Sequence, residues 1–247
     1  AGGILADDMG LGKTVRSIFS RKYSDVNSIN VFKHQPQVQA ATFISAMIKA
    51  KHVKRALVVV PVAVMPQWLE SLREWGRGKL VLWLFHGSSV KRRNRALRMA
   101  STHGGVCVTT YSMIRLHVDK FIKDTTWDVL ICDEAHIIKN AHSKTSKAMR
   151  KIESRHRYLL TGTPIQNSLS EYRHLLVYAA GSSLDLYHND NDDENSEEFR
   201  HLVQNPIERG AARDATDVQK RRAISLTRSL HEAARPFVLR RTYPLFF

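Results

Sequence analysis

Short apolar runs separated by segments of helical periodicity constrain the fold of this chain more than any other feature. The runs cover residues 56–60, 80–85, 105–111, 128–132 and 158–160, and helical spacing is found in residues 39–48, 66–75, 91–98 and 215–234. Apolar runs of this length, ended by a breaker or a polar residue, are typical of buried parallel strands. The alternation predicts right-handed crossovers and an α/β fold with a mostly parallel sheet, whose functional loops gather at the carboxyl ends of the strands.

A glycine-rich stretch at residues 2–14 ends in Gly-Leu-Gly-Lys-Thr, which is typical of a phosphate-binding loop. The predicted nucleotide contacts are Asp8, Met9, Gly10, Leu11, Gly12, Lys13 and Thr14. Lys13 would meet the β- and γ-phosphates, and Thr14 would place its hydroxyl on a magnesium ion that the nucleotide brings. The general template for such a loop has a glycine at the position of Asp7. The alternative to a phosphate-binding loop is therefore an ordinary glycine-rich turn that caps a helix.

Adjacent carboxylates follow the apolar run at residues 128–132, in the sequence Asp133-Glu134-Ala135-His136. Hydrolysis of a phosphoanhydride needs a metal ion beside the phosphates and a group that orients the attacking water. We predict that Asp133 binds the magnesium ion and that Glu134 positions or deprotonates the water, with Lys13 and His136 completing the catalytic set. We expect His136 to bond the hydroxyls of Thr161 and Thr163, which follow a neighbouring strand. The alternative is a charged surface turn.

The charge balance favours a polyanionic partner. The 247 residues carry a formal net charge of +15, with basic clusters at residues 49–55 and 91–98, which indicates nucleic acid, although solvated helix faces also carry charge. No run approaches the roughly 18–20 apolar residues that span a bilayer, so we expect no membrane partner. Cys107 and Cys132 lie in apolar runs without ligand-spaced partners, which predicts core residues and not a zinc site.

Residues 16–38 interrupt the helix expected behind the phosphate loop. Joining Val15 directly to Gln39 would give one continuous amphipathic helix leading out of the loop. We therefore interpret residues 16–38 as an insertion, either translated intron sequence or a natural surface insertion, which sequencing of the mature transcript would distinguish.

Three motifs in order carry a family resemblance: Gly-Ile-Leu-Ala-Asp-Asp-Met-Gly-Leu-Gly-Lys-Thr, Asp-Glu-Ala-His with Ile-Ile-Lys-Asn, and Leu-Thr-Gly-Thr-Pro-Ile-Gln-Asn. Together they resemble the first motor lobe of the Swi/Snf family of DNA-dependent ATPases, in helicase superfamily two. Asp7, which departs from the general loop template, is what this family carries at that position. Within the family the chain is most similar to the branch of the Cockayne syndrome B and anaphase-bridge translocases.

The resemblance implies a three-layer RecA-like P-loop lobe over residues 1–180, followed at 181–247 by an acidic loop and a helical extension toward a second lobe absent from this chain. It implies DNA contacts at Gln67, Trp68, Thr110, Tyr111 and Asn140. It also implies residues that couple the nucleotide site to the DNA surface, namely Thr161, Gly162, Thr163, Gln166 and Asn167.

The function implied is the ATP-binding lobe of a nuclear ATPase that uses ATP and Mg²⁺ to translocate on duplex DNA, including nucleosomal DNA, in chromatin remodelling or DNA repair. The missing lobe would supply arginine fingers, which are worth about 10³–10⁵ in rate in related enzymes. Because the chain begins inside a motif, we expect a fragment that is weak or inactive alone. The alternative is a truncated nucleotide- or DNA-binding module with no turnover. A small-molecule kinase would leave the Asp-Glu-Ala-His motif and the basic excess unexplained.

Overall fold

The computed structural model of the chain describes residues 2–6, 36–76, 80–123, 126–162, 168–181 and 197–240. Among the predicted site residues, those of the phosphate loop (8–14) and Thr163, Gln166 and Asn167 lie outside the described residues. Of the acidic stretch predicted as a loop at residues 190–198, residues 190–196 lie outside them as well.

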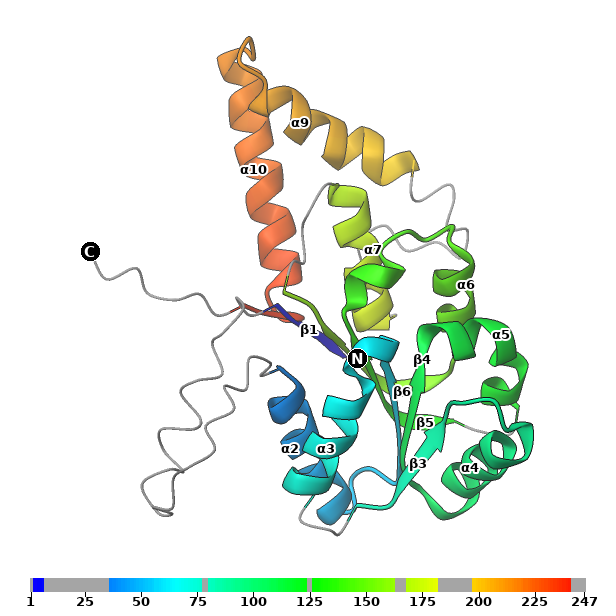
Figure 1. Cartoon of the computed structure of the whole chain (residues 1–247). Helices are drawn as coiled ribbons and strands as arrows, with labels where there is room; N and C mark the ends of the chain where they lie inside the picture. The colour runs from blue at the N-terminus through cyan, green and yellow to red at the C-terminus, as the bar shows by residue number, and fades with distance from the viewer. Residues whose placement is uncertain are drawn as a thin grey trace.

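A parallel sheet forms the centre of the described structure (Figure 1). Its strands lie in the order β3-β4-β2-β5-β6-β1-β7, and every neighbouring pair among them is parallel. The strands are β1 (Gly3–Leu5), β2 (Arg55–Val60), β3 (Leu82–Phe85), β4 (Gly105–Thr110), β5 (Trp127–Asp133), β6 (Ser154–Leu160) and β7 (Val238–Leu239). The parallel α/β fold predicted from the sequence is therefore confirmed.

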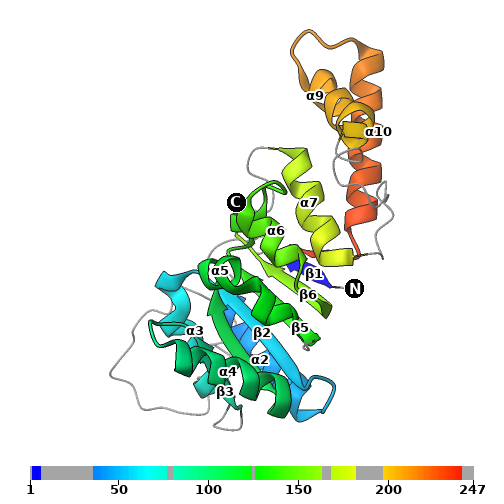
Figure 2. The ribbon, with the colours of Figure 1, turned by 90° about the vertical axis from the view of Figure 1, so that its right-hand side faces the viewer.

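Helices cover both faces of this sheet. The helices of the described residues are α2 (Pro36–Lys49), η2 (Val62–Val64), α3 (Met65–Trp75), α4 (Val90–His103), α5 (Tyr111–Ile122), η3 (Ala135–Ile138), α6 (Lys144–Arg150), α7 (Leu169–Ala180), η5 (Arg200–Gln204), α9 (Asn205–Ala211) and α10 (Asp217–Ala234). Of these, η5, α9 and α10 do not cover the sheet (Figures 1 and 2). Successive side chains of β2 point to opposite faces. Leu57 and Val59 accordingly pack in the core under α4–α7, whereas Val58 and Val60 pack in the core under α2 and α3.

The predicted elements differ from the observed ones mainly at their ends. The strand expected at residues 105–111 stops at Thr110, because the Thr110 hydroxyl accepts a hydrogen bond from Met113 N and caps α5, which begins at Tyr111. Helix α2, expected from Gln39, begins at Pro36. Residues 36–38 of the predicted insertion therefore form the first turn of α2.

A helical arm stands away from the sheet and consists of η5, α9 and α10 (Figures 1 and 2). Phe199, Val203 and Leu230 form its own small core. Helices α9 and α10 approach closely at Gly210, where an added Cβ would lie 2.3 Å from Ala223 Cβ. The chain returns from α10 to the sheet, where Phe237 O accepts from Ile4 N and β7 pairs with β1.

No helix in the described part of the chain has the length and apolar character needed to cross a membrane.

A buried carboxylate fixes the register between the amino ends of β2 and β5. Asp128, 7% exposed, accepts hydrogen bonds at Oδ2 from Lys54 N and Arg55 N, both at 2.8 Å. These bonds tie the first residues of β2 to β5 and so help to set where β5 ends, which is where the candidate site lies.

We predict that Asp128→Ala lowers the free energy of unfolding by about 2–4 kcal/mol, because two partly buried hydrogen bonds from backbone N–H groups to a charged acceptor are lost. Urea denaturation of the chain would measure the change. Asp119→Ala, at an exposed position of α5, is the control and should shift the value by about 0.5 kcal/mol or less. Equal losses in the two variants would contradict the assigned role of Asp128.

Candidate functional site

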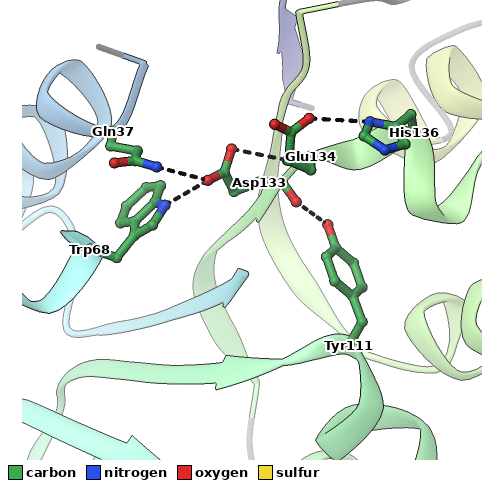
Figure 3. Close-up of polar contacts among 6 residues, drawn as sticks. All are labelled: Gln37, Trp68, Tyr111, Asp133, Glu134 and His136. Atoms are coloured by element: carbon green, nitrogen blue, oxygen red, sulfur yellow. Dashed lines mark hydrogen bonds and ion pairs between the residues drawn. The ribbon is translucent and has the colours of Figure 1, made fainter. Parts of the chain in front are cut away.

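The candidate site lies at the carboxyl end of β5, where Asp133 and Glu134 follow each other. The Asp133 side chain is largely buried, at 7% exposure, whereas Glu134 is only half-buried. Glu134 has a left-handed backbone (φ 51°, ψ 51°), which is uncommon for a residue other than glycine. This sharp turn directs the two adjacent carboxylates away from each other (Figure 3).

Trp68 and Gln37 hold one oxygen of the Asp133 carboxylate. Trp68 Nε1, from α3, donates to Oδ2 at 2.7 Å, and Gln37 Nε2, from the first turn of α2, donates to the same oxygen at 3.4 Å. The other oxygen, Oδ1, accepts from Glu134 N at 2.9 Å. A buried carboxylate needs such donors, since its desolvation is otherwise costly. The Asp133 side chain is therefore held in one orientation at the edge of the sheet.

Tyr111 supports the same residue through the backbone. Its hydroxyl donates to Asp133 O at 2.6 Å from the start of α5. Burial raises the pKa of Tyr111 well above its ordinary value, and nearby Cys132 and Asp133 raise it further, so the phenol stays protonated as a donor. The end of β5 is thus fixed from α2, α3 and α5 together.

The carboxylate of Glu134 faces His136 on the opposite side. Glu134 Oε2 lies 3.2 Å from His136 Nδ1, and both side chains are partly exposed. We expected His136 to bond the hydroxyls of Thr161 and Thr163. Its ring instead contacts Glu134, two residues earlier in the chain.

The segment that follows, η3, is anchored to α6 and α7. Lys139 Nζ lies 3.1 Å from Glu171 Oε2, and His174 Nε2 lies 2.9 Å from Ser146 Oγ. Burial lowers the pKa of His174 to about 4, assisted by the nearby positive charges of Arg150 and Arg173, so the ring is neutral at pH 7. The segment that carries Glu134 and His136 is therefore followed directly by an ion pair to α7, which is itself bonded to α6.

The structure brings together only part of the predicted DNA-contact set. Gln67 and Asn140 are exposed. Trp68, Thr110 and Tyr111 are 0%, 1% and 5% exposed, and their polar atoms are used within the protein: Trp68 and Tyr111 hold Asp133, and Thr110 caps α5. Buried side chains cannot reach a ligand at the surface. These three residues therefore stabilise the carboxyl edge of the sheet from within the protein.

Two predicted coupling residues, Thr161 and Gly162, follow β6 at the same edge. Thr161 is buried, and its backbone N donates to Leu5 O at the end of β1 at 3.0 Å. The end of β1 leads directly into the predicted phosphate loop. Asp133, Thr161 and the end of β1 consequently share one edge of the sheet.

The donor chemistry of Asp133 fits magnesium, which prefers hard oxygen ligands and usually takes one or two carboxylates plus phosphates. The described residues contain no group of three or more His, Cys, Asp or Glu that could hold a metal by themselves. A single carboxylate with a free lone-pair direction is suited to an ion that arrives with a nucleotide.

The roles of Trp68 and Gln37 toward Asp133 were not predicted. Trp68 lies at core spacing with Leu72 on α3, and a tryptophan at such a position is indistinguishable from a packing residue. Gln37 belongs to the segment interpreted as an insertion, where no helix was expected. Only the pairing of α2 and α3 with the end of β5 reveals both contacts.

Comparison with known proteins gives consistent matches. The model of the SNF2-related domain matches residues 1–244. The chain is 35% identical over 246 residues to a DNA excision repair protein ERCC-6-like of Danio rerio, covering 98% of this chain and 15% of that protein. It is 32% identical over 251 residues to Protein CHROMATIN REMODELING 24 of Arabidopsis thaliana, covering 97% of this chain and 20% of that protein.

Among solved structures, the SWI2/SNF2 ATPase core of Sulfolobus solfataricus in complex with double-stranded DNA superposes with a TM-score of 0.67 at 26% identity. The match covers 98% of this chain and 41% of that one. The chain therefore corresponds to less than half of the solved core and to a small share of the curated relatives.

We predict that Trp68→Phe lowers the free energy of unfolding by about 1–3 kcal/mol, because it preserves an aromatic ring but removes a buried donor to a charged acceptor. Trp127→Phe is the matched control, since Trp127 is also fully buried but its Nε1 has no hydrogen-bond partner among the described residues. Chemical denaturation would compare the two. A loss in the Trp127 variant equal to that in the Trp68 variant would show that the indole N–H of Trp68 does not stabilise Asp133.

Proposed function

Because this chain belongs to the SNF2-related domain family, we propose that it is the ATP-binding lobe of a DNA-dependent ATPase that hydrolyses ATP to move along duplex DNA. The observation that carries the proposal is the pair of adjacent carboxylates at the end of β5, one buried and fixed, the other half-buried and turned away. The predicted phosphate-loop sequence follows β1 at the same edge of the sheet.

Asp133 and Glu134 have different proposed roles in ATP hydrolysis. Asp133 and Thr14 would hold the magnesium ion, which would neutralise charge on the phosphates. Glu134 orients the attacking water or accepts its proton, and the nearby His136 keeps the Glu134 carboxylate in place. Lys13 contacts the β- and γ-phosphates. Residues 8–12 supply backbone N–H groups to the phosphates, which a loop at a helix N-terminus does readily.

Duplex DNA is the proposed macromolecular partner. The formal net charge of +15 supports it, and so does the double-stranded DNA bound to the similar Sulfolobus solfataricus core. Gln67 and Asn140 are the proposed contacts, because they are the exposed members of the predicted set. Thr161, Gly162, Thr163, Gln166 and Asn167 would couple this surface to the nucleotide.

The proposed setting is the nucleus, in chromatin remodelling or DNA repair, with nucleosomal DNA among the substrates. Relatives named for DNA excision repair and chromatin remodelling support this assignment. A second motor lobe is the proposed protein partner, because catalysis in such motors needs cationic groups from across the nucleotide.

One observation favours a second function, a nucleotide- or DNA-binding module without turnover. The Gln37 amide donates to Asp133 Oδ2, so one oxygen of the proposed metal-binding carboxylate is already engaged within the protein.

We predict that Glu134→Gln preserves ATP affinity and reduces turnover by about 10²-fold or more in a two-lobed form, since the amide cannot accept a proton or orient water in the same way. Lys13→Ala should instead weaken ATP binding. Isothermal titration and steady-state ATPase assays would separate the effects. Undiminished turnover in the Glu134 variant would contradict the water-orienting role.

ATPase rate with and without duplex DNA, in this chain and in a version extended through the second lobe, tests the proposal directly. Both versions should be prepared with and without residues 16–38. We expect DNA-stimulated turnover in the extended form, and DNA affinity that falls steeply with salt and depends little on sequence. Absence of DNA stimulation in every extended form would contradict the proposed function.

A further inference from the structure

Strand β3 forms one edge of the sheet, and its outer side is open. Among the described residues it pairs with β4 alone. Val81 O accepts a hydrogen bond from Val106 N at 2.9 Å, so Val81 and every second residue after it direct their backbone groups toward β4. The N–H and C=O groups of Leu82 and Leu84 are therefore directed away from the sheet, where a further strand would bond them.

The composition of this edge does not oppose the addition of a strand. Natural edge strands are commonly protected by charged side chains, by proline, by a bulge or by being short. Residues 80–85 are apolar throughout, the pairing with β4 is unbroken, and Val81 and Leu84 are 53% and 41% exposed. Only the length of β3, four residues, limits pairing. The edge therefore suits one short segment and not a growing stack of strands.

The two faces of β3 have different surroundings, because successive side chains of a strand point to opposite faces. Trp83 and Phe85 pack on the face covered by α4, where the Trp83 indole donates to Gly104 O at 2.8 Å. Leu82 packs on the face covered by α3, and Leu84 shares that face but remains exposed. A strand added to β3 would continue this alternation, with its side chains beside α4 and beside Leu84 in turn.

The flank of α4 beside this edge is basic. Asn94 Oδ1 accepts a hydrogen bond from Lys120 Nζ of α5 at 2.8 Å, so the Asn94 flank of α4 faces α5. Arg92 and Arg95 are exposed and lie roughly 160° and 100° around the helix from Asn94. Helix α4 packs on β3 and β4, and α5 follows on the side of α6 (Figure 2). The two arginines consequently lie on the side of the open edge.

These surroundings distinguish between possible occupants. Helix α3 carries exposed residues of both signs, Glu70, Arg73 and Glu74, so the excess positive charge at this edge comes from α4. A second copy of the chain, paired edge to edge about a two-fold axis, would bring the same basic flanks together. Duplex DNA would contact the arginines but would leave the apolar side chains and the backbone groups of β3 without partners.

We propose that the open edge of β3 binds an extended segment of a partner protein in which apolar and acidic residues alternate, and that the segment adds to the sheet as a further strand. The apolar side chains would cover Leu84, and the acidic ones would pair with Arg92 and Arg95. This interaction goes beyond ATP hydrolysis, because β4 and β2 separate β3 from the carboxylates at the end of β5.

The test uses a fluorescent, end-blocked peptide of alternating valine and glutamate, about six residues long, which is a usual strand length. Its affinity for the intact chain is measured by anisotropy and compared with that of a valine–lysine peptide. Two further peptides are N-methylated at alternate residues, which removes the N–H donors from one side of the added strand or from the other. These peptides test strand addition without altering the protein.

We expect the valine–glutamate peptide to bind about tenfold or more tightly than the valine–lysine peptide, since like charges would face each other in the latter. One N-methylation pattern should abolish binding, because it removes the donors that face β3. The other pattern should preserve binding, because its methyl groups face solvent.

Variants at exposed positions locate the contact. Leu84→Lys should weaken binding by about tenfold or more, because it places a charge beside the valines. Arg92→Glu combined with Arg95→Glu should reverse the preference toward the valine–lysine peptide. The matched control is Lys91→Glu combined with Arg98→Glu, which changes the charge of α4 equally away from the edge and should preserve the preference for glutamate. Circular dichroism checks that each variant is folded.

Failure of the valine–glutamate peptide to bind the intact chain would overturn the proposal, and so would equal effects of the two N-methylation patterns. Two other results count against it as directly. The first is a loss of duplex DNA affinity in the Arg92 and Arg95 variant without any peptide binding, which would assign the edge to DNA. The second is a dimer of the intact chain that Leu84→Lys dissociates, which would assign the edge to a second copy.

Discussion

The hydrogen bond between the Trp68 indole and the Asp133 carboxylate joins α3 to the end of β5, and the organisation of the site depends on it. A carboxylate that is 7% exposed is stable only if buried donors replace the lost water, and Trp68, Gln37 and the N–H of Glu134 supply them. These donors come from different elements. The position of one side chain therefore depends on the packing of α2 and α3 against one face of the sheet, while Tyr111 fixes the adjacent carbonyl from the other face.

The two carboxylates at the carboxyl end of β5 differ in how firmly they are held and in their access to solvent. Asp133 is held in one orientation, whereas Glu134 turns out through a left-handed backbone and is only half-buried beside His136. A metal ligand benefits from fixed geometry, and a residue that orients water must reach solvent and substrate. The backbone turn between two neighbouring residues gives each of them the environment that its role requires.

The sequence predicted the central strands well, because residues 56–60 and 129–132 are continuous apolar runs of the kind that is typical of a buried strand. It did not predict β1 and β7, which are too short to show periodicity and which form by pairing with each other and with β6. The Asp133-Glu134 pair was predicted from its motif. The contacts of Trp68 and Gln37 with Asp133 were not predicted. Each of them depends on the packing of a helix that is distant in sequence from β5 against the end of that strand. Tyr111 and Thr110 were expected at the surface, but α5 begins at Tyr111 and buries both.

The central claim is that Asp133 is the carboxylate that receives the metal ion of a bound nucleotide. The most direct measurement is the affinity of Mn²⁺, followed by electron paramagnetic resonance, for the nucleotide complex of the chain lacking residues 16–38. Asp133→Asn should weaken Mn²⁺ binding by about tenfold or more, whereas Asp119→Asn, at an exposed position of α5, should leave it unchanged. Equal Mn²⁺ affinity in the Asp133 variant and the unaltered chain would contradict the account.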